Sequence, residues 1–118
     1  MSDPTILVVE DEPILRMAAL AMMDDAGFEA IGARSSEMAI RILETFPSIR
    51  VIFTDVDLGP GEDGLWLASR VRDGWPPVGI IVTSGHRHVS RAVIPEGAVF
   101  LGKPYLEEQV LDEVRRFA

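Results

Sequence analysis

The fold of this chain is decided by residues 5–13, which read TILVVEDEP. The first half, Thr5–Val9, is a run dominated by β-branched residues, which is typical of a strand covered on both faces of a parallel sheet. Three acids follow, and Pro13 then opens a helical pattern, because proline is favoured in the first turn of a helix. The stretch therefore predicts a buried strand that passes directly into a helix.

The same alternation of strand and helix continues along the chain. Strand patterns recur at residues 29–33, 51–54, 78–82 and 98–101. Helical patterns occupy about residues 13–26, 35–46, 65–72 and 106–117. Residues 86–96 contain Pro95 and several β-branched residues, so we expect at most one or two helical turns there. This order predicts an α/β fold, a five-stranded parallel sheet with helices on both faces joined by right-handed crossovers.

The bulk properties restrict the classes of function. The 118 residues fit one domain, and the absence of cysteine excludes a disulfide scaffold, a zinc ribbon and a thiol nucleophile. A formal net charge of −8 disfavours direct binding to nucleic acid or to anionic membranes. The apolar runs are too short to span a bilayer, and the acidic amino terminus lacks the basic region of a signal peptide. We expect a single cytoplasmic domain over residues 1–118.

Polar residues gather where the predicted strands end. They are Glu10, Asp11 and Glu12 after the first strand, Asp55 and Asp57 after the third, Thr83 and Ser84 after the fourth, and Lys103 after the fifth. Each group has an ordinary explanation: acids favour a helix amino terminus, hydroxyls cap helices, and loop acids and lysines are solvated.

The combination of these groups favours a functional site. In a parallel α/β sheet the carboxyl ends of the strands meet at one edge, so Glu10, Asp11 and Asp55 are expected to converge. Clustered carboxylates repel one another unless a cation is present, and a hard divalent ion such as Mg²⁺ takes oxygen ligands. With the hydroxyl of Thr83 and the ammonium of Lys103, these are the groups that phosphoryl transfer requires.

Four motifs resemble, in order and spacing, those of response-regulator receiver domains. They lie at residues 7–13, 53–55, 82–85 and 103–104, so the resemblance covers essentially the whole chain. It implies a flavodoxin-like, doubly wound (βα)5 fold in a two-component system or phosphorelay.

The resemblance also implies roles for individual residues. Asp55 is similar to the phosphoacceptor, and Glu10 and Asp11 to an acidic pair that holds Mg²⁺ or Mn²⁺ beside it. Asp57 would add its backbone carbonyl to the metal. In the family, a hydroxyl like that of Thr83 and an ammonium like that of Lys103 contact the phosphoryl group.

Further expectations from the resemblance concern switching and partners. Phe100 falls at an aromatic position that rotates when the residue corresponding to Thr83 moves. The bond between Lys103 and Pro104 is often cis in relatives. The phosphodonor would be a phosphohistidine on a sensor kinase or a histidine phosphotransfer protein, and the chain would not be an enzyme beyond its own phosphorylation and dephosphorylation. The given sequence ends at Ala118 without an output domain, so we expect either a stand-alone receiver or the receiver part of a longer protein. The sequence indicates no oligomeric state.

Two segments depart from the family pattern. The loop at residues 57–63 is slightly longer than usual and contains Gly59-Pro60-Gly61 in place of a hydrophobic residue and proline. The segment between Thr83 and Lys103 is slightly short. We therefore expect the loop over the site to have a different shape, and the output of the signal to differ.

Alternative interpretations remain open at this point. Asp55 and Asp57 also resemble the nucleophile and general acid of a haloacid-dehalogenase-like phosphatase, although here the other acids precede Asp55 rather than follow the lysine. A second alternative is an interaction module that needs no phosphorylation. The helix at residues 13–26 is apolar nearly all round, which indicates either core packing or a face on which a partner docks.

Overall fold

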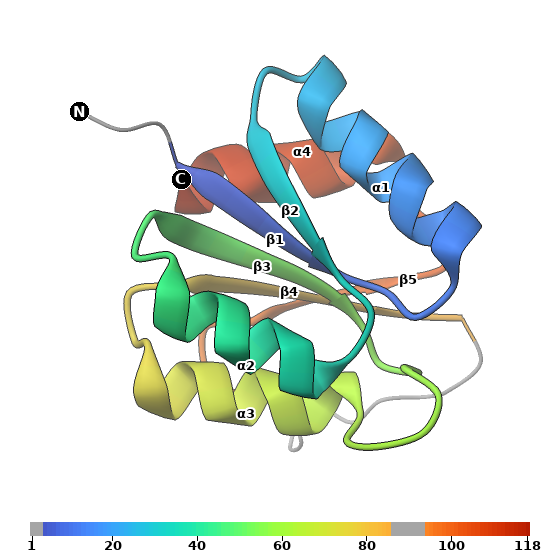
Figure 1. Ribbon diagram of the computed structural model, residues 1–118. Helices are drawn as coiled ribbons and strands as arrows, with labels where there is room; N and C mark the ends of the chain where they lie inside the picture. Colours follow the sequence, from blue (N-terminus) through green and yellow to red (C-terminus); the bar gives the residue numbers. More distant parts are fainter. Residues whose placement is uncertain (1–3, 86–93) are drawn as a thin grey trace.

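The computed structural model describes residues 4–85 and 94–118, in which five strands alternate with four helices (Figure 1). In chain order these are β1 (Thr5–Val9), α1 (Pro13–Asp25), β2 (Glu29–Ala33), α2 (Ser36–Thr45), β3 (Ile49–Asp55), α3 (Gly64–Gly74), β4 (Gly79–Ser84), β5 (Val99–Gly102) and α4 (Glu107–Phe117). None of the helices in these ranges has the length and apolar character needed to cross a membrane.

The strands form one parallel sheet in the order β2-β1-β3-β4-β5. Helices α2 and α3 cover one face of this sheet, and α1 and α4 cover the other (Figure 1). The α/β class, the parallel sheet and the doubly wound arrangement predicted from the sequence are therefore confirmed.

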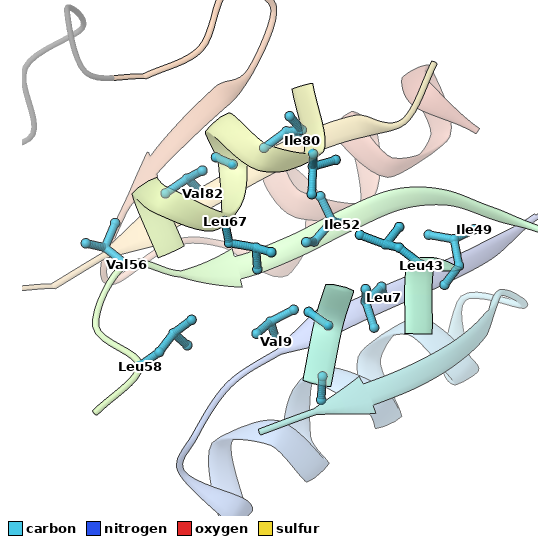
Figure 2. Packing of buried hydrophobic residues seen from close by; sticks show 14 residues of the cluster. Leu7, Val9, Leu43, Ile49, Ile52, Val56, Leu58, Leu67, Ile80 and Val82 are labelled. Atoms are coloured by element: carbon cyan, nitrogen blue, oxygen red, sulfur yellow. The ribbon is translucent and has the colours of Figure 1, made fainter. Parts of the chain in front are cut away.

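Each face of the sheet has its own hydrophobic core. Strand β1 supplies both, because alternate side chains of a strand point to opposite faces: Leu7 and Val9 pack under α2 and α3, whereas Ile6 and Val8 pack under α1 and α4. Figure 2 shows the core on the α2 and α3 side. The continuous apolar run of β1 is thus explained by burial on both faces.

Local signals explain where the helices begin and end. Gly27, with a φ of 89°, follows α1 in the left-handed region that glycine adopts readily. The Ser35 hydroxyl accepts a hydrogen bond from the backbone N–H of Met38, and the Asp63 carboxylate accepts one from that of Trp66, so these residues cap α2 and α3.

Strands β3 and β4 are longer than predicted. Asp55 pairs with Thr83 in the ladder between β3 and β4, and Ser84 pairs with Gly102 of β5. Thr83 and Ser84 therefore belong to a strand, and the ordinary explanation that they cap a helix is wrong. The short helical segment predicted within residues 86–96 falls largely on residues 86–93, outside the described part of the chain.

Candidate functional site

The carboxyl ends of β1, β3, β4 and β5 meet at one edge of the sheet. The backbone N–H of Val56 donates to the carbonyl of Thr83 over 2.9 Å, and the backbone N–H of Lys103 donates to the carbonyl of Ser84 over 3.0 Å. These bonds extend the sheet ladder beyond Asp55 and bring Lys103 to the same edge. The predicted convergence of strand-end residues is therefore present.

Asp55 is held through both of its carboxylate oxygens. Lys103 Nζ lies 2.6 Å from Asp55 Oδ2, and the backbone N–H of Asp57 donates to Asp55 Oδ1 over 3.0 Å. Only 8% of Asp55 is exposed. Burial by itself would lower the pKa of Lys103, but the hydrogen bond and the negative charge of Asp55 outweigh burial and raise it. Lys103 is thus a firmly charged partner for this carboxylate.

Glu10 is a buried carboxylate beside this pair. Its Oε2 accepts a hydrogen bond from the backbone N–H of Glu12 over 3.1 Å, and 7% of the residue is exposed. Burial is the main cause that raises the pKa of Glu10 from 4.5 to about 7; Asp11 and Asp55 add to the rise, while the Glu12 bond and Lys103 oppose it. The positive charge of Lys103 therefore does not balance the acids at this edge.

The donor set fits a hard divalent cation. Glu10 interacts electrostatically with Asp55, and the exposed Asp11 interacts with the Glu10 carboxyl, so a solvent-facing acid adjoins the buried acid beside Asp55. Within residues 4–85 and 94–118, no three histidine, aspartate or glutamate side chains gather closely enough to enclose a metal by themselves. Mg²⁺ does not need such a cage, because it commonly uses one or two carboxylates and completes its shell with water and phosphate oxygens.

Thr83 and Phe100 lie on opposite faces of the sheet. Thr83 lines a groove on the α1 and α4 side, and its buried hydroxyl has no hydrogen-bond partner in the described ranges. Phe100 is half-buried against the core on the α2 and α3 side, where its ladder partner is Val82. The paired strands β4 and β5 therefore separate the two side chains.

A groove of about 540 Å³ runs from Asp55 between α1 and the connection from β5 to α4. Leu15, Ala18 and Met22 of α1 line one wall, and Pro104 and Tyr105 line the other. The bond between Lys103 and Pro104 is cis, the form that the resemblance gave as frequent among relatives. The inner face of α1 packs in the core, which confirms core packing for that face. Ile14, Leu15 and Met17 are exposed, and a docking face on this helix stays a prediction.

Two residues near the site were missed by reasoning from the sequence. Tyr105 packs edge-on against Phe53, with ring centroids 5.8 Å apart, and burial raises the pKa of its phenol. Ser36 donates hydrogen bonds from α2 to the loop that follows Asp55. The position of Tyr105 directly after Lys103 and Pro104 was an available signal; Ser36 offered none, because its loop partners are 26 and 27 residues away.

Comparisons with known proteins agree with this architecture. A family model described as the response regulator receiver domain matches residues 6–115. An NtrX-like response regulator of Rickettsia felis is 30% identical over 98% of this chain, and the nitrogen assimilation regulatory protein NtrX of Azorhizobium caulinodans is 32% identical over 90% of it. The chain spans only about a quarter of the length of these relatives, 25% and 24% respectively.

Solved structures give the same result. A response regulator receiver protein from Sinorhizobium medicae superposes with a TM-score of 0.88 and 29% identity, covering 98% of this chain and 94% of that one. A second, from Pseudomonas putida, has a TM-score of 0.86 and 30% identity, covering 98% of each chain. These matches favour the receiver interpretation over a haloacid-dehalogenase-like phosphatase.

Proposed function

This chain belongs to the response regulator receiver domain family of two-component signal transduction, and on that premise we propose that Asp55 accepts a phosphoryl group from a phosphohistidine. The observation that carries the proposal is the environment of the Asp55 carboxylate. It ends β3 with Lys103 Nζ at 2.6 Å and the buried acid Glu10 beside it. This arrangement pairs the buried carboxylate with a cation that is fixed beside it.

The transfer is a displacement at phosphorus. One oxygen of the Asp55 carboxylate forms a bond to phosphorus as the P–N bond of the donor breaks, and the electron pair of that bond returns to the imidazole. The ammonium of Lys103 neutralises charge on the transferred oxygens, and the N–H of Asp57 keeps the carboxylate oriented. The resulting acyl phosphate is later hydrolysed, so the chain acts as a phosphoacceptor and has no other catalytic activity.

Glu10 and Asp11 are proposed to hold Mg²⁺ or Mn²⁺, together with Asp55 and the backbone carbonyl of Asp57. When bound, the ion would offset negative charge on the phosphoryl group. The raised pKa of Glu10 supports this role, because buried acids that lack sufficient positive charge retain their protons.

The apolar groove beside α1 is the proposed approach of the phosphodonor, a histidine kinase or a histidine phosphotransfer protein. The groove opens onto Asp55, and Leu15, which is half exposed, forms part of its apolar wall. A partner helix with apolar side chains around its histidine would cover this surface and exclude water from the transfer.

The proposed switch begins at Thr83. Its buried hydroxyl has no partner in the described part of the chain, so a phosphoryl oxygen on Asp55 would supply one and draw the residue toward the site. Thr83 and Phe100 belong to adjacent, paired strands, which gives a route by which that movement reaches the aromatic side chain.

The test is phosphorylation with a small donor. Incubating the chain with Mg²⁺ and acetyl phosphate should add one phosphoryl group by intact mass, and beryllofluoride should shift the resonances of Thr83 and Phe100. Asp55→Asn should abolish both effects. Lys103→Ala should fold but show a weakened response, because the fixed positive charge is lost.

The outcomes separate the alternatives. An unmodified wild-type chain with unchanged spectra would support an interaction module that needs no phosphorylation. Sustained hydrolysis of a generic phosphomonoester, lost in Asp57→Ala, would support a phosphatase instead.

A further inference from the structure

The loop between β3 and α3 is anchored to the rest of the fold, although its sequence is rich in glycine and proline. Val56 and Leu58 bury their side chains in the core on the α2 and α3 side (Figure 2). The loop is therefore anchored at its start, close to Asp55, by two apolar side chains.

Ser36 anchors the other end of this loop. Its side chain is fully buried, and its hydroxyl lies 3.0 Å from the backbone carbonyl oxygen of Glu62 and 3.2 Å from that of Asp63. The adjacent Ser35 makes a different bond, to the backbone N–H of Met38 within α2. Of these two serines, one caps the helix and the other ties the helix to the loop.

The middle of the loop fits closely between α2 and the acid Asp11. A β-carbon at Gly59 would lie 2.9 Å from Asp11 Oδ2, and one at Gly61 would lie 2.9 Å from Glu37 Oε1. Both glycines have positive φ values, 70° and 98°. The backbone of the loop thus backs onto the carboxylate of Asp11 on one side and onto the first turn of α2 on the other.

We propose that Ser36 is a positioning residue for the metal site, and that its hydrogen bonds to the loop set the affinity of the chain for Mg²⁺. The inference rests on the proposed function, because it takes Asp11 and the carbonyl of Asp57 as the groups that hold the ion. Asp11 is exposed and would otherwise sample several rotamers. A loop fixed by Ser36 holds Gly59 against Asp11, so less conformational freedom is lost when the ion binds.

The first experiment measures Mg²⁺ binding by calorimetry. Ser36→Ala removes both bonds to the loop, and it should weaken the affinity for Mg²⁺ about tenfold, a magnitude found when groups behind a metal ligand are removed. Ser35→Ala is the matched control. It removes a hydroxyl one residue away, and it should lower the urea midpoint through loss of the helix cap while leaving the Mg²⁺ dissociation constant within about twofold.

A second pair of variants tests the loop without altering Ser36. Gly61→Ala adds a methyl group at positive φ against Glu37, so it should also weaken Mg²⁺ binding. Gly27→Ala imposes similar backbone strain at a φ of 89°, where no atom lies within 4 Å of the added carbon. Gly27→Ala should lower stability without weakening Mg²⁺ binding. The comparison of Gly61→Ala with Gly27→Ala therefore tests the inference even if Ser36→Ala does not fold.

Phosphorylation by acetyl phosphate separates this inference from the proposed function. Ser36→Ala should need more Mg²⁺ for half-maximal phosphorylation but reach the wild-type rate when Mg²⁺ saturates. If Ser36→Ala and Gly61→Ala bind Mg²⁺ as the wild type does, the inference is overturned while phosphorylation of the wild type still supports the proposed function. If the wild type binds Mg²⁺ but forms no acyl phosphate, the proposed function fails on its own.

Discussion

The two faces of the sheet differ at the edge where Asp55 lies. On the α1 and α4 side, a groove of about 540 Å³ leads outward from the site, and apolar residues of α1 are exposed along it. On the α2 and α3 side, Leu58 packs in the core (Figure 2). On the same side, the Ser36 hydroxyl hydrogen-bonds the loop to α2. In the described ranges, we call the first face open because a groove leads into the site, and the second face closed because its loop is tied to the core and to α2.

This difference shows how the carboxyl end of β3 can be both accessible to a partner and held in place. A phosphodonor must reach Asp55, which requires a gap in the helix layer on one side. The acids beside Asp55 must keep their positions without that partner, which requires a rigid loop on the other side. An apolar side chain therefore contributes to stability on the closed face, where it is buried, and contributes little on the open face, where it is exposed.

The largest expected effect comes from exchanging leucine for alanine on each face. Leu58, 2% exposed, fills the closed side, so Leu58→Ala should lower the free energy of unfolding by about 3 kcal/mol. Leu15, 50% exposed, lies on the open side, and Leu15→Ala should change the free energy of unfolding by less than about 0.5 kcal/mol. Urea unfolding measures both values.

The same leucine variants should differ in function. Leu15→Ala should slow phosphotransfer from a donor protein but not from acetyl phosphate, because only the protein needs the groove. Equal losses of stability at the two positions would refute the contrast between an open and a closed face.

A smaller effect is expected at Glu10, which lines the groove on the open side. Because folding raises the pKa of Glu10 from 4.5 to about 7, the folded state binds its proton more tightly than the unfolded state does. Wild-type stability therefore falls as pH rises from 4.5 through 7, and the loss is complete above that range. Without metal, Glu10→Gln should exceed the wild type by about 2 kcal/mol near pH 8 and match it at acidic pH.

Added Mg²⁺ provides the control for this prediction. The ion should stabilise the wild type at alkaline pH and have less effect on Glu10→Gln, because the variant lacks the buried charge. A constant difference between the two proteins across the pH range would argue against burial of an unbalanced carboxylate.

The smallest expected effect concerns two buried hydroxyls that point to opposite faces. Thr83 shares a face with Ile81 on the open side, and Ser84 shares one with Val82 on the closed side. Neither hydroxyl has a partner within the described ranges, so Thr83→Val and Ser84→Ala should each stabilise the chain by up to about 1 kcal/mol. Thermal unfolding measures this gain.

The two hydroxyl variants should separate in their response to beryllofluoride. Thr83→Val should lose the spectral change that marks switching, and Ser84→Ala should retain it. Loss of the response in both variants would show that the closed face also takes part in the switch.

The sequence alone was sufficient for the fold and for the acids of the candidate site. The apolar run of Thr5–Val9 predicted a strand buried on both faces, since only a doubly covered sheet accommodates such a run. Residues placed after predicted strands, such as Asp55 and Lys103, were expected at one edge because parallel strands end together. Periodicity and chain order carry this information locally.

The tertiary structure decided what depends on contacts between distant residues. Ser36 and Ser35 are adjacent serines that cannot be told apart in the sequence, yet one bonds to its own helix and the other to a loop 26 and 27 residues away. The raised pKa of Glu10 likewise follows chiefly from burial, to which the adjacent Asp11 and the distant Asp55 of β3 add. Local patterns determined which residues reach the edge of the sheet, whereas packing determined which face is open, which is closed, and that burial raises the pKa of Glu10.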